Sequence, residues 1–155
     1  MKIESVIEPN ELILNLQNEA IKEVKNILSN PNVSAVGGMA VPMTGRPELD
    51  IIVISEDVEG DADKLENNGF MYRTPDSNSI FLKKKVDGVE IAVEITTSDN
   101  PRIELHKKII NIMRSDSDLR KQYEEFKRTL GGLGREEYKI KKTKWMKENL
   151  LPKLD

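Results

Sequence analysis

The first apolar pattern in the chain has the spacing of a helix. Asn10 is a typical N-cap residue, and Glu11 places a negative charge in the first turn, where it favours the helix dipole. Apolar residues then recur every three or four positions, at Ile13, Leu16, Ala20, Val24, Ile27 and Leu28. Residues 29–32 contain Ser, Asn and Pro and stop the pattern. We therefore predict a helix over residues 11–28 that packs on a sheet.

Shorter apolar runs predict strands. Residues 49–54 are continuously apolar apart from Asp50, as is typical of a central strand buried on both faces. Residues 80–86 and 89–96 flank Asp87-Gly88, a strong signal for a two-residue hairpin. Along residues 89–96, Val and Ile alternate with Glu90, Ala92 and Glu94, so the two sets point to opposite faces. Residues 33–36 and 70–72 are further short strands, and residues 2–8 form an edge strand or a lead-in.

The last third of the chain has helical spacing. Pro101 at the first helical position opens a helix to about residue 113. Ser115 and Asp118 are spaced like a capping box and open the next helix, which ends at the glycines of residues 131–134. A final helix covers residues 135–151, and a short one covers residues 61–68. These elements predict a single α/β (α+β) domain over residues 1–155, with a core at about 10–97 and a helical part at about 98–152.

The composition describes a soluble, highly charged protein. Apolar residues make up 37% and charged residues 33% of 155 positions, and there is no cysteine for a disulfide or thiolate metal site. No run reaches the length of a membrane span, and the N-terminus lacks the apolar core of a signal peptide. We therefore expect a cytoplasmic protein without a membrane partner.

Charge divides the chain into two parts. Residues 1–100 hold 9 Lys/Arg and 18 Asp/Glu, whereas residues 101–155 hold 15 and 9. Amphipathic helices with Lys- and Arg-rich solvent faces are one explanation of the basic part. The alternative is that these helices fold back toward the acidic part and supply cations for phosphate. The basic helices also offer a surface for nucleic acid, although the overall net charge of −3 disfavours that use.

The candidate site residues lie in and around the loop between the predicted strands at residues 33–36 and 49–54. Gly37-Gly38 follows the strand at 33–36 and can bring backbone N–H groups close to a phosphate. Glu48 and Asp50 stand two residues apart on the strand that follows, so their carboxylates share one face. Such a pair suits Mg²⁺, with Mn²⁺ as the alternative, because Mg²⁺ binds carboxylates together with substrate phosphates. Arg46 in the same loop adds positive charge.

The strand at 89–96 offers a third carboxylate. If its polar face lies beside residues 49–54, Glu90 or Glu94 joins Glu48 and Asp50 in a metal site. The alternative is that both glutamates face solvent on a half-exposed strand. For Asp50, whose burial is costly without a partner, the alternative to a metal is an ion pair with Arg46 or a later lysine.

The segment from Val36 to Val53, with Gly37-Gly38, the loop Met39-Ala40-Val41-Pro42-Met43-Thr44-Gly45-Arg46-Pro47 and Glu48-Leu49-Asp50, resembles the GrpB-like family. Tyr123-Glu124-Glu125-Phe126-Lys127 looks like that family's Tyr-x-x-x-Lys helix, and Arg135-Glu136-Glu137-Tyr138 with Lys142 looks like its closing helix. The resemblance implies the nucleotidyltransferase fold of the DNA polymerase beta-like superfamily, with a mixed sheet flanked by helices. It also implies a nucleotide-type site at Gly37 and Gly38, with Tyr138 and Lys142 as family positions. In some bacteria a GrpB-like domain is fused to dephospho-CoA kinase.

The chain departs from that family in several places. Gly37-Gly38 replaces the superfamily's Gly-Ser, and Arg46 replaces a Lys, which keeps the charge but changes its geometry. Glu90 and Glu94 stand in a strand that is rich in His in many members. Conversely, Glu48-Leu49-Asp50 is closer to the superfamily's Asp-x-Asp strand than is usual in GrpB-like proteins.

Two hypotheses about function follow. In the first, the chain is an Mg²⁺-dependent nucleotidyltransferase-like protein in which Glu48 and Asp50 are catalytic. Its metal ligands are Glu48, Asp50 and Glu90 or Glu94; its nucleotide- or phosphate-binding residues are Gly37, Gly38, Arg46, Lys127, Tyr138 and Lys142. In the second, the fold is kept without the reaction, as a binding module for a nucleotide, a CoA-like ligand or a protein. A structure in which Glu90 and Glu94 are both directed away from Asp50 favours the second hypothesis.

Overall fold

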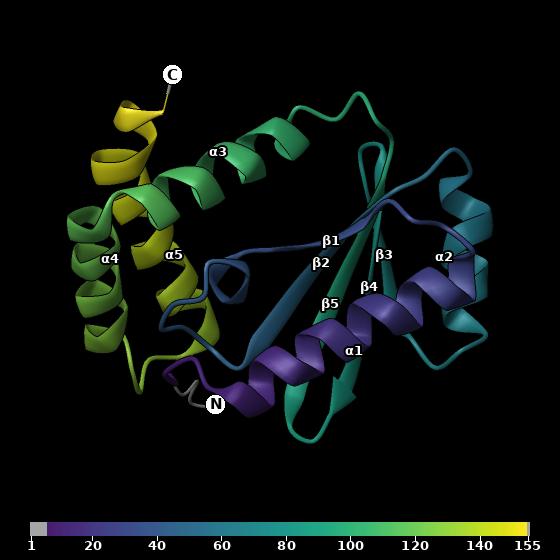
Figure 1. Cartoon of the computed structure of the whole chain (residues 1–155), viewed down its shortest axis with the longest axis horizontal. Helices are drawn as coiled ribbons and strands as arrows, with labels where there is room; N and C mark the ends of the chain where they lie inside the picture. The colour runs from purple at the N-terminus through teal and green to yellow at the C-terminus, as the bar shows by residue number, and fades with distance from the viewer. Residues whose placement is uncertain (1–5, 155) are drawn as a thin grey trace.

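A computed structural model describes residues 6–154, which form a mixed five-stranded sheet flanked by helices (Figure 1). The strands are β1 (Val33–Val36), β2 (Glu48–Ile54), β3 (Met71–Asp76), β4 (Ser79–Val86) and β5 (Val89–Thr96). The α-helices are α1 (Glu11–Leu28), α2 (Val58–Glu66), α3 (Arg102–Ser115), α4 (Ser117–Thr129) and α5 (Arg135–Trp145). The predicted fold class is confirmed.

The strand order is β1-β2-β5-β4-β3, which places β2 and β5 side by side at the centre of the sheet. These two strands are parallel, whereas the other neighbouring pairs are antiparallel. Asp50 lies opposite Val36 of β1 on one side and Ala92 of β5 on the other. The predicted hairpin joins β4 to β5, and both of its turn residues, Asp87 and Gly88, have positive φ, as a type I′ turn requires.

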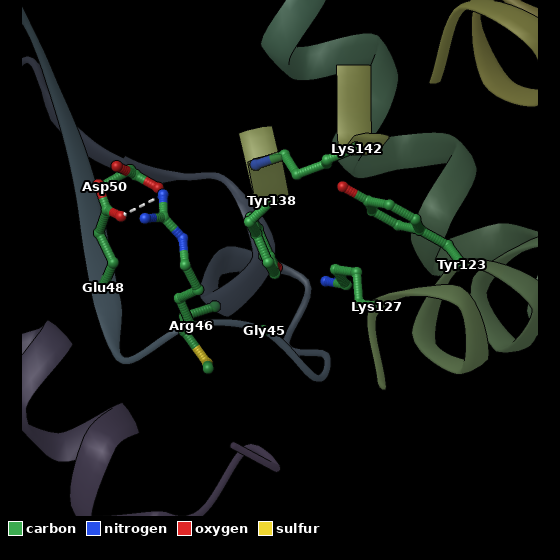
Figure 2. A pocket seen from close by; sticks show the side chains of 10 residues that line it. Gly45, Arg46, Glu48, Asp50, Tyr123, Lys127, Tyr138 and Lys142 are labelled. Atoms are coloured by element: carbon green, nitrogen blue, oxygen red, sulfur yellow. Dashed lines mark ion pairs between the residues drawn. The ribbon is translucent and has the colours of Figure 1, made fainter. Parts of the chain in front are cut away.

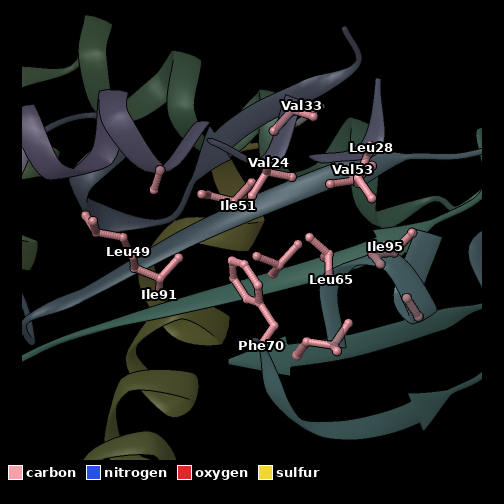
Figure 3. Packing of buried hydrophobic residues seen from close by; sticks show 14 of the residues in the cluster. Val24, Leu28, Val33, Leu49, Ile51, Val53, Leu65, Phe70, Ile91 and Ile95 are labelled. Carbon is pink, nitrogen blue, oxygen red and sulfur yellow. The ribbon is translucent and has the colours of Figure 1, made fainter. Parts of the chain in front are cut away.

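The main core lies between one face of this sheet and helices α1 and α2 (Figure 3). Its residues are buried Val, Ile, Leu and Phe side chains, among them Val24, Leu28, Leu49, Ile51, Val53, Leu65, Phe70, Ile91 and Ile95. Burying each such side chain contributes about 1.5–3 kcal/mol relative to exposure. Because alternate residues of a strand point to opposite faces, packing Leu49 and Ile51 on this side directs Glu48 and Asp50 to the other.

The C-terminal helices form a second, smaller core on the opposite side of the sheet. Helix α3 leads from the sheet to α4 and α5, which stand next to each other (Figure 1). Tyr123 of α4 stacks on Trp145 of α5, with ring centroids 4.7 Å apart, and Phe126 stacks on the same indole at 5.8 Å. Val36 and Ile52 of the sheet pack with Ile103 of α3. The polar face of β2 is thus directed toward helices α3, α4 and α5, which include Tyr123.

Several helix boundaries differ from the sequence prediction. Ser115 is predicted to cap the helix that follows it, but Asp116 is the N-cap, and its carboxylate accepts a hydrogen bond from Leu119 N at 3.0 Å. Pro101 is the N-cap of α3 and not its first residue. The last helix is regular only to Trp145, after which a π turn covers Met146–Leu150. Of the predicted N-terminal strand, residues 2–5 lie outside the described residues and Ile7 forms an isolated bridge with Gly45.

Candidate functional site

A cavity of about 160 Å³ lies between the polar face of β2, the loop at residues 37–47 and helices α4 and α5 (Figure 2). Its lining consists of two glycines, one methionine and seven side chains that are charged or phenolic: Gly38, Met39, Gly45, Arg46, Glu48, Asp50, Tyr123, Lys127, Tyr138 and Lys142. Segments from the first and last thirds of the chain therefore meet at one site. Most of the residues that the sequence singled out line this cavity.

Glu48 and Asp50 project from β2 as predicted, and Arg46 lies beside them (Figure 2). The Arg46 guanidinium forms an ion pair with Glu48 at 2.9 Å, and both side chains are less than one-fifth exposed. The same guanidinium lies over the Tyr138 ring, 5.0 Å from its centroid, which is a cation–π geometry. Arg46 therefore joins the carboxylates of the sheet to helix α5.

Gly37 is a required glycine because of Asp50. Its φ is +75°, in the region that disfavours any residue with a Cβ. A Cβ added to Gly37 would stand 2.5 Å from Asp50 Oδ2, so the carboxylate fills the space that a side chain would need. The second glycine has a different neighbour, since a Cβ on Gly38 would lie 3.5 Å from Lys127 Nζ. The pair Gly37-Gly38 thus separates the carboxylate from the ammonium.

Asp50 holds its proton more tightly than an ordinary aspartate. Burial raises its pKa to about 7, with a further contribution from the neighbouring Glu48, and nearby Lys142 and Arg46 act in the opposite direction. The alternative expected for Asp50, an ion pair with Arg46 or a later lysine, does not form within residues 6–154, although both Lys142 and Arg46 attract its charged form. At neutral pH the carboxylate is divided between its charged and neutral forms.

Lys127 is a buried cation that faces the cavity. Its side chain is only 3% exposed, and its ammonium lies 4.4 Å from the centroid of the Tyr123 ring (Figure 2). Within residues 6–154 it forms no ion pair with a carboxylate. Burial, together with the nearby charge of Lys142, lowers the pKa of Lys127 to about 7. Burial also lowers the pKa of Lys142, against the attraction of Asp50.

Glu90 and Glu94 share the face of Asp50 but are held by other cations. Glu90 lies opposite Glu48 and pairs with Lys83 at 3.5 Å and Arg135 at 3.2 Å. Glu94 lies opposite Ile52 and accepts a hydrogen bond from Ser79 Oγ at 2.8 Å and one from Arg102. The residue of β5 that lies directly beside Asp50 is Ala92, and neither glutamate occupies that position.

The carboxylates at the cavity form a small donor set for a metal. Residues 6–154 contain no group of three or more His, Cys, Asp or Glu side chains arranged to hold an ion. Glu48 and Asp50 remain as two carboxylates, and Arg46 already pairs with the first. Such a set suits at most one Mg²⁺ that takes its other ligands from phosphate and water, and it does not suit the two-ion clamp of many phosphoryl-transfer enzymes.

Three residues of the cavity, Met39, Gly45 and Tyr123, were not singled out as site residues from the sequence. Tyr123 falls in an apolar stripe and Gly45 in a loop, yet both line the cavity with Lys127. A Cβ on Gly45 would stand 3.5 Å from Lys127 Nζ. The spacing of Tyr123 and Lys127 could have indicated the contact, because residues four apart share a helix face.

The basic C-terminal helices use their charge in two ways. Lys127 and Lys142 point into the cavity (Figure 2), whereas Lys139, Lys144 and Lys147 line an exposed hollow on the outer side of α5. Some lysines of these helices therefore face the acidic sheet, and others form an exposed surface. None of the helices within residues 6–154 is at once long and apolar enough to cross a membrane.

The family model described as GrpB protein matches residues 5–151 of the chain. The chain belongs to the GrpB family. This match confirms the resemblance seen in the sequence, in the loop at 37–47 and in the two C-terminal helices. No curated protein matches the chain.

The GrpB chain is also similar to solved structures of nucleotidyltransferases. A cytoplasmic RNA terminal U-transferase aligns with 15% identity over 76% of this chain and 38% of that one, with a TM-score of 0.56. The Cid1 poly(U) polymerase with Mg and 3′-dATP bound aligns with 12% identity over 76% and 40%, at 0.56. Cid1 with the UTP analog UMPNPP aligns with 16% identity over 73% and 37%, at 0.53. At these identities the likeness shows the fold alone, and the chain spans about two-fifths of those proteins.

Proposed function

We propose that the cavity binds the phosphate groups of a nucleotide. The observation that carries this proposal is the convergence of Arg46, Lys127 and Lys142, from three separate segments, on one small cavity beside the glycines of the 37–47 loop. A buried ammonium without a carboxylate partner is costly, and an anionic ligand removes that cost. Phosphate is the anion that such a set of lysines and an arginine recognises best.

Ligand binding would change the protonation of the site. The pKa of Lys127, lowered to about 7 in the free protein, rises when a phosphate comes within reach of its ammonium. The protein therefore takes up a proton on binding near or above neutral pH. Phosphate close to Asp50 also favours the neutral form of that carboxyl group, unless a cation stands between them.

A divalent cation is a second component of the proposal. Glu48 and Asp50 are the residues that would hold one Mg²⁺ or Mn²⁺, with phosphate oxygens completing its shell. Such an ion would supply Lewis-acid activation of a phosphoryl group. Arg46 already neutralises Glu48, so we expect phosphate binding to persist without the metal and to tighten in its presence.

The direct test is isothermal titration calorimetry with ATP, GTP, CTP and UTP, each with Mg²⁺ and with EDTA. We expect binding in both conditions, and Lys127→Met or Lys142→Met should weaken it by roughly ten- to hundred-fold, the usual cost of a lost charge-assisted hydrogen bond. Lys141→Met is the matched control, because Lys141 lies on α5 with its side chain 51% exposed and pairs with Glu137. Absence of binding, or equal affinities in all variants, would refute the proposal.

Nucleotidyl transfer is the second candidate function, favoured by the carboxylate pair on the strand next to β5 and by the nucleotidyltransferase-like fold. In this case a nucleophile of an acceptor attacks the α-phosphorus of a bound nucleoside triphosphate when Mg²⁺ is present. A bond to the acceptor forms, the α–β phosphoanhydride bond breaks, and pyrophosphate leaves. Pyrophosphate release that disappears in Asp50→Asn would establish transfer. Tight binding without release would leave a binding module for a nucleotide or a CoA-like ligand that has kept the fold alone.

A further inference from the structure

A second cavity, of about 330 Å³, lies on the other side of Asp50. It adjoins the first cavity, which is proposed to bind phosphate and is called the phosphate cavity below. The two share Gly38, Asp50, Tyr123 and Lys142 in their walls. The first cavity alone is smaller than the roughly 300–1,000 Å³ of typical small-molecule sites, whereas the second falls within that range. A ligand larger than a few phosphate groups can therefore extend past Asp50 into the second cavity.

The second cavity has walls suited to a flat ring. Its floor is the polar face of the sheet, where Ala92 of β5 lies beside Asp50 and Phe81 of β4 lies opposite Glu94. Its roof is helix α3, where Arg102, His106 and Ile110 stand four residues apart and so share one face. Ala92 and Phe81 on the floor and Ile110 on the roof give this slot apolar walls, and its charged side chains lie among them.

Two polar side chains stand at the end of this slot that is farther from the phosphate cavity. Glu94 is buried, at 8% exposure, and its hydrogen bonds from Ser79 and Arg102 both end on Oε2, which leaves Oε1 as an acceptor for a ligand. The Arg102 guanidinium lies over the Phe81 ring, 5.4 Å from its centroid, and the side chain lines the slot while remaining partly exposed to solvent. Glu94 lies two residues beyond Ala92, so its Cα stands roughly 8 Å from that of Asp50 across the strand pair.

We propose that this slot holds the nucleobase of the nucleotide whose phosphates occupy the first cavity. Glu94 accepts a hydrogen bond from a ring N–H or amino group of the base, and Arg102 donates one to a ring nitrogen or carbonyl oxygen. This inference rests on the proposed function, and it makes the ligand a nucleotide rather than any polyphosphate. Hydrogen bonds of a base edge to a carboxylate and a guanidinium are the ordinary means by which proteins recognise bases.

His106 provides a test that needs no mutation, because it is the only histidine of the chain and lines the slot. Its ring protons give one isolated set of NMR signals. Titration with a nucleotide at constant pH should shift these signals, whereas inorganic tripolyphosphate, which fills only the first cavity, should leave them nearly unchanged. Equal responses to the two ligands would overturn the placement of the base.

Calorimetry with the same two ligands measures the contribution of the slot. We expect nucleotides to bind at least roughly ten-fold more tightly than tripolyphosphate, and Glu94→Gln to remove most of that advantage, as expected for a hydrogen bond to a charged group. Glu90→Gln is the matched control, since Glu90 lies on the same face of the same strand but lines neither cavity. Ala92→Leu, which fills the slot, should weaken nucleotide binding and leave tripolyphosphate binding intact.

The outcomes separate this inference from the proposed function. If tripolyphosphate and nucleotides bind equally well, or if Glu94→Gln and Glu90→Gln behave alike, the base does not occupy the slot, although the phosphate site stands. If neither ligand binds, the phosphate site itself is wrong.

Discussion

Lys127→Met should make the free protein more stable at neutral pH, although it removes a site residue. Lys127 is 3% exposed and its pKa is lowered from 10.5 to about 7, because burial penalises its charged form. Because the pKa is lowered, between pH 7 and pH 10.5 the lysine is mostly protonated in the unfolded chain and mostly neutral in the folded one. Lys127 therefore costs no stability above pH 10.5. As the pH falls from 10.5 through 7, its burial progressively lowers the free energy of unfolding.

The size of the effect follows from the pKa change. Each pKa unit corresponds to about 1.4 kcal/mol, so the wild type should gain about 3 kcal/mol from this group between pH 7 and about pH 9.5. Methionine has similar length and no charge, so the variant lacks this gain. The free energy of unfolding of Lys127→Met minus that of the wild type should thus be largest at pH 7 and fall by about 3 kcal/mol toward pH 9.5.

Urea unfolding followed by Trp145 fluorescence at several pH values measures this difference. Trp145 stacks on Tyr123, beside the site, so its emission reports on the helical side of the cavity. The exposed control Lys141→Met should stay within about 0.5 kcal/mol of the wild type at every pH. A difference that does not change with pH, or a less stable Lys127→Met protein at pH 7, would refute the reasoning.

Three further predictions concern Gly37, Asp50 and the N-cap of helix α4. Gly37→Ala should destabilise the protein by at least about 1 kcal/mol, measured by urea unfolding, because φ is +75° and the new Cβ meets Asp50 Oδ2 at 2.5 Å; unchanged stability would contradict this. The pKa of Asp50 is raised to about 7, so its contribution to stability is present below pH 4 and is lost as pH rises through 7. Asp50→Asn should therefore be more stable than the wild type at pH 8, by up to about 4 kcal/mol, with the difference nearly vanishing in thermal melts near pH 4. Asp116→Ala should cost about 1 kcal/mol by the same urea assay, and Ser115→Ala much less; the reverse order would place the cap of α4 at Ser115.

The sequence predicted the parts of the fold that depend on local pattern. The continuous run at 49–54 is the central strand β2, and Asp87-Gly88 is the turn between β4 and β5. That Glu48 and Asp50 share one face follows from their spacing alone, since alternation along a strand does not depend on its neighbours. The strand and the common direction of its two carboxylates are therefore properties of the local sequence.

The relation between Asp50 and the later strand is not a local property. Whether Glu90, Ala92 or Glu94 stands beside Asp50 depends on the register of β2 and β5, and a shift of two residues would exchange their places. That register is set by the packing of Leu49, Ile51 and Val53 in the main core and not by a turn. The same limit applies to Lys127 and Lys142, whose approach to the site depends on how the helices pack. A family pattern could name these lysines, but not their depth of burial.

The order of the site's segments along the chain has a consequence for synthesis on the ribosome. Residues 6–96 contain the whole sheet, but the ammonium groups of the site come from helices α4 and α5, which follow the sheet along the chain. At ordinary translation speeds the final third of the chain takes roughly 3–12 s to appear. During that interval the sheet displays its carboxylates with Arg46 as their nearby cation. The proposed affinity for phosphate therefore requires segments that are made only after the sheet is complete.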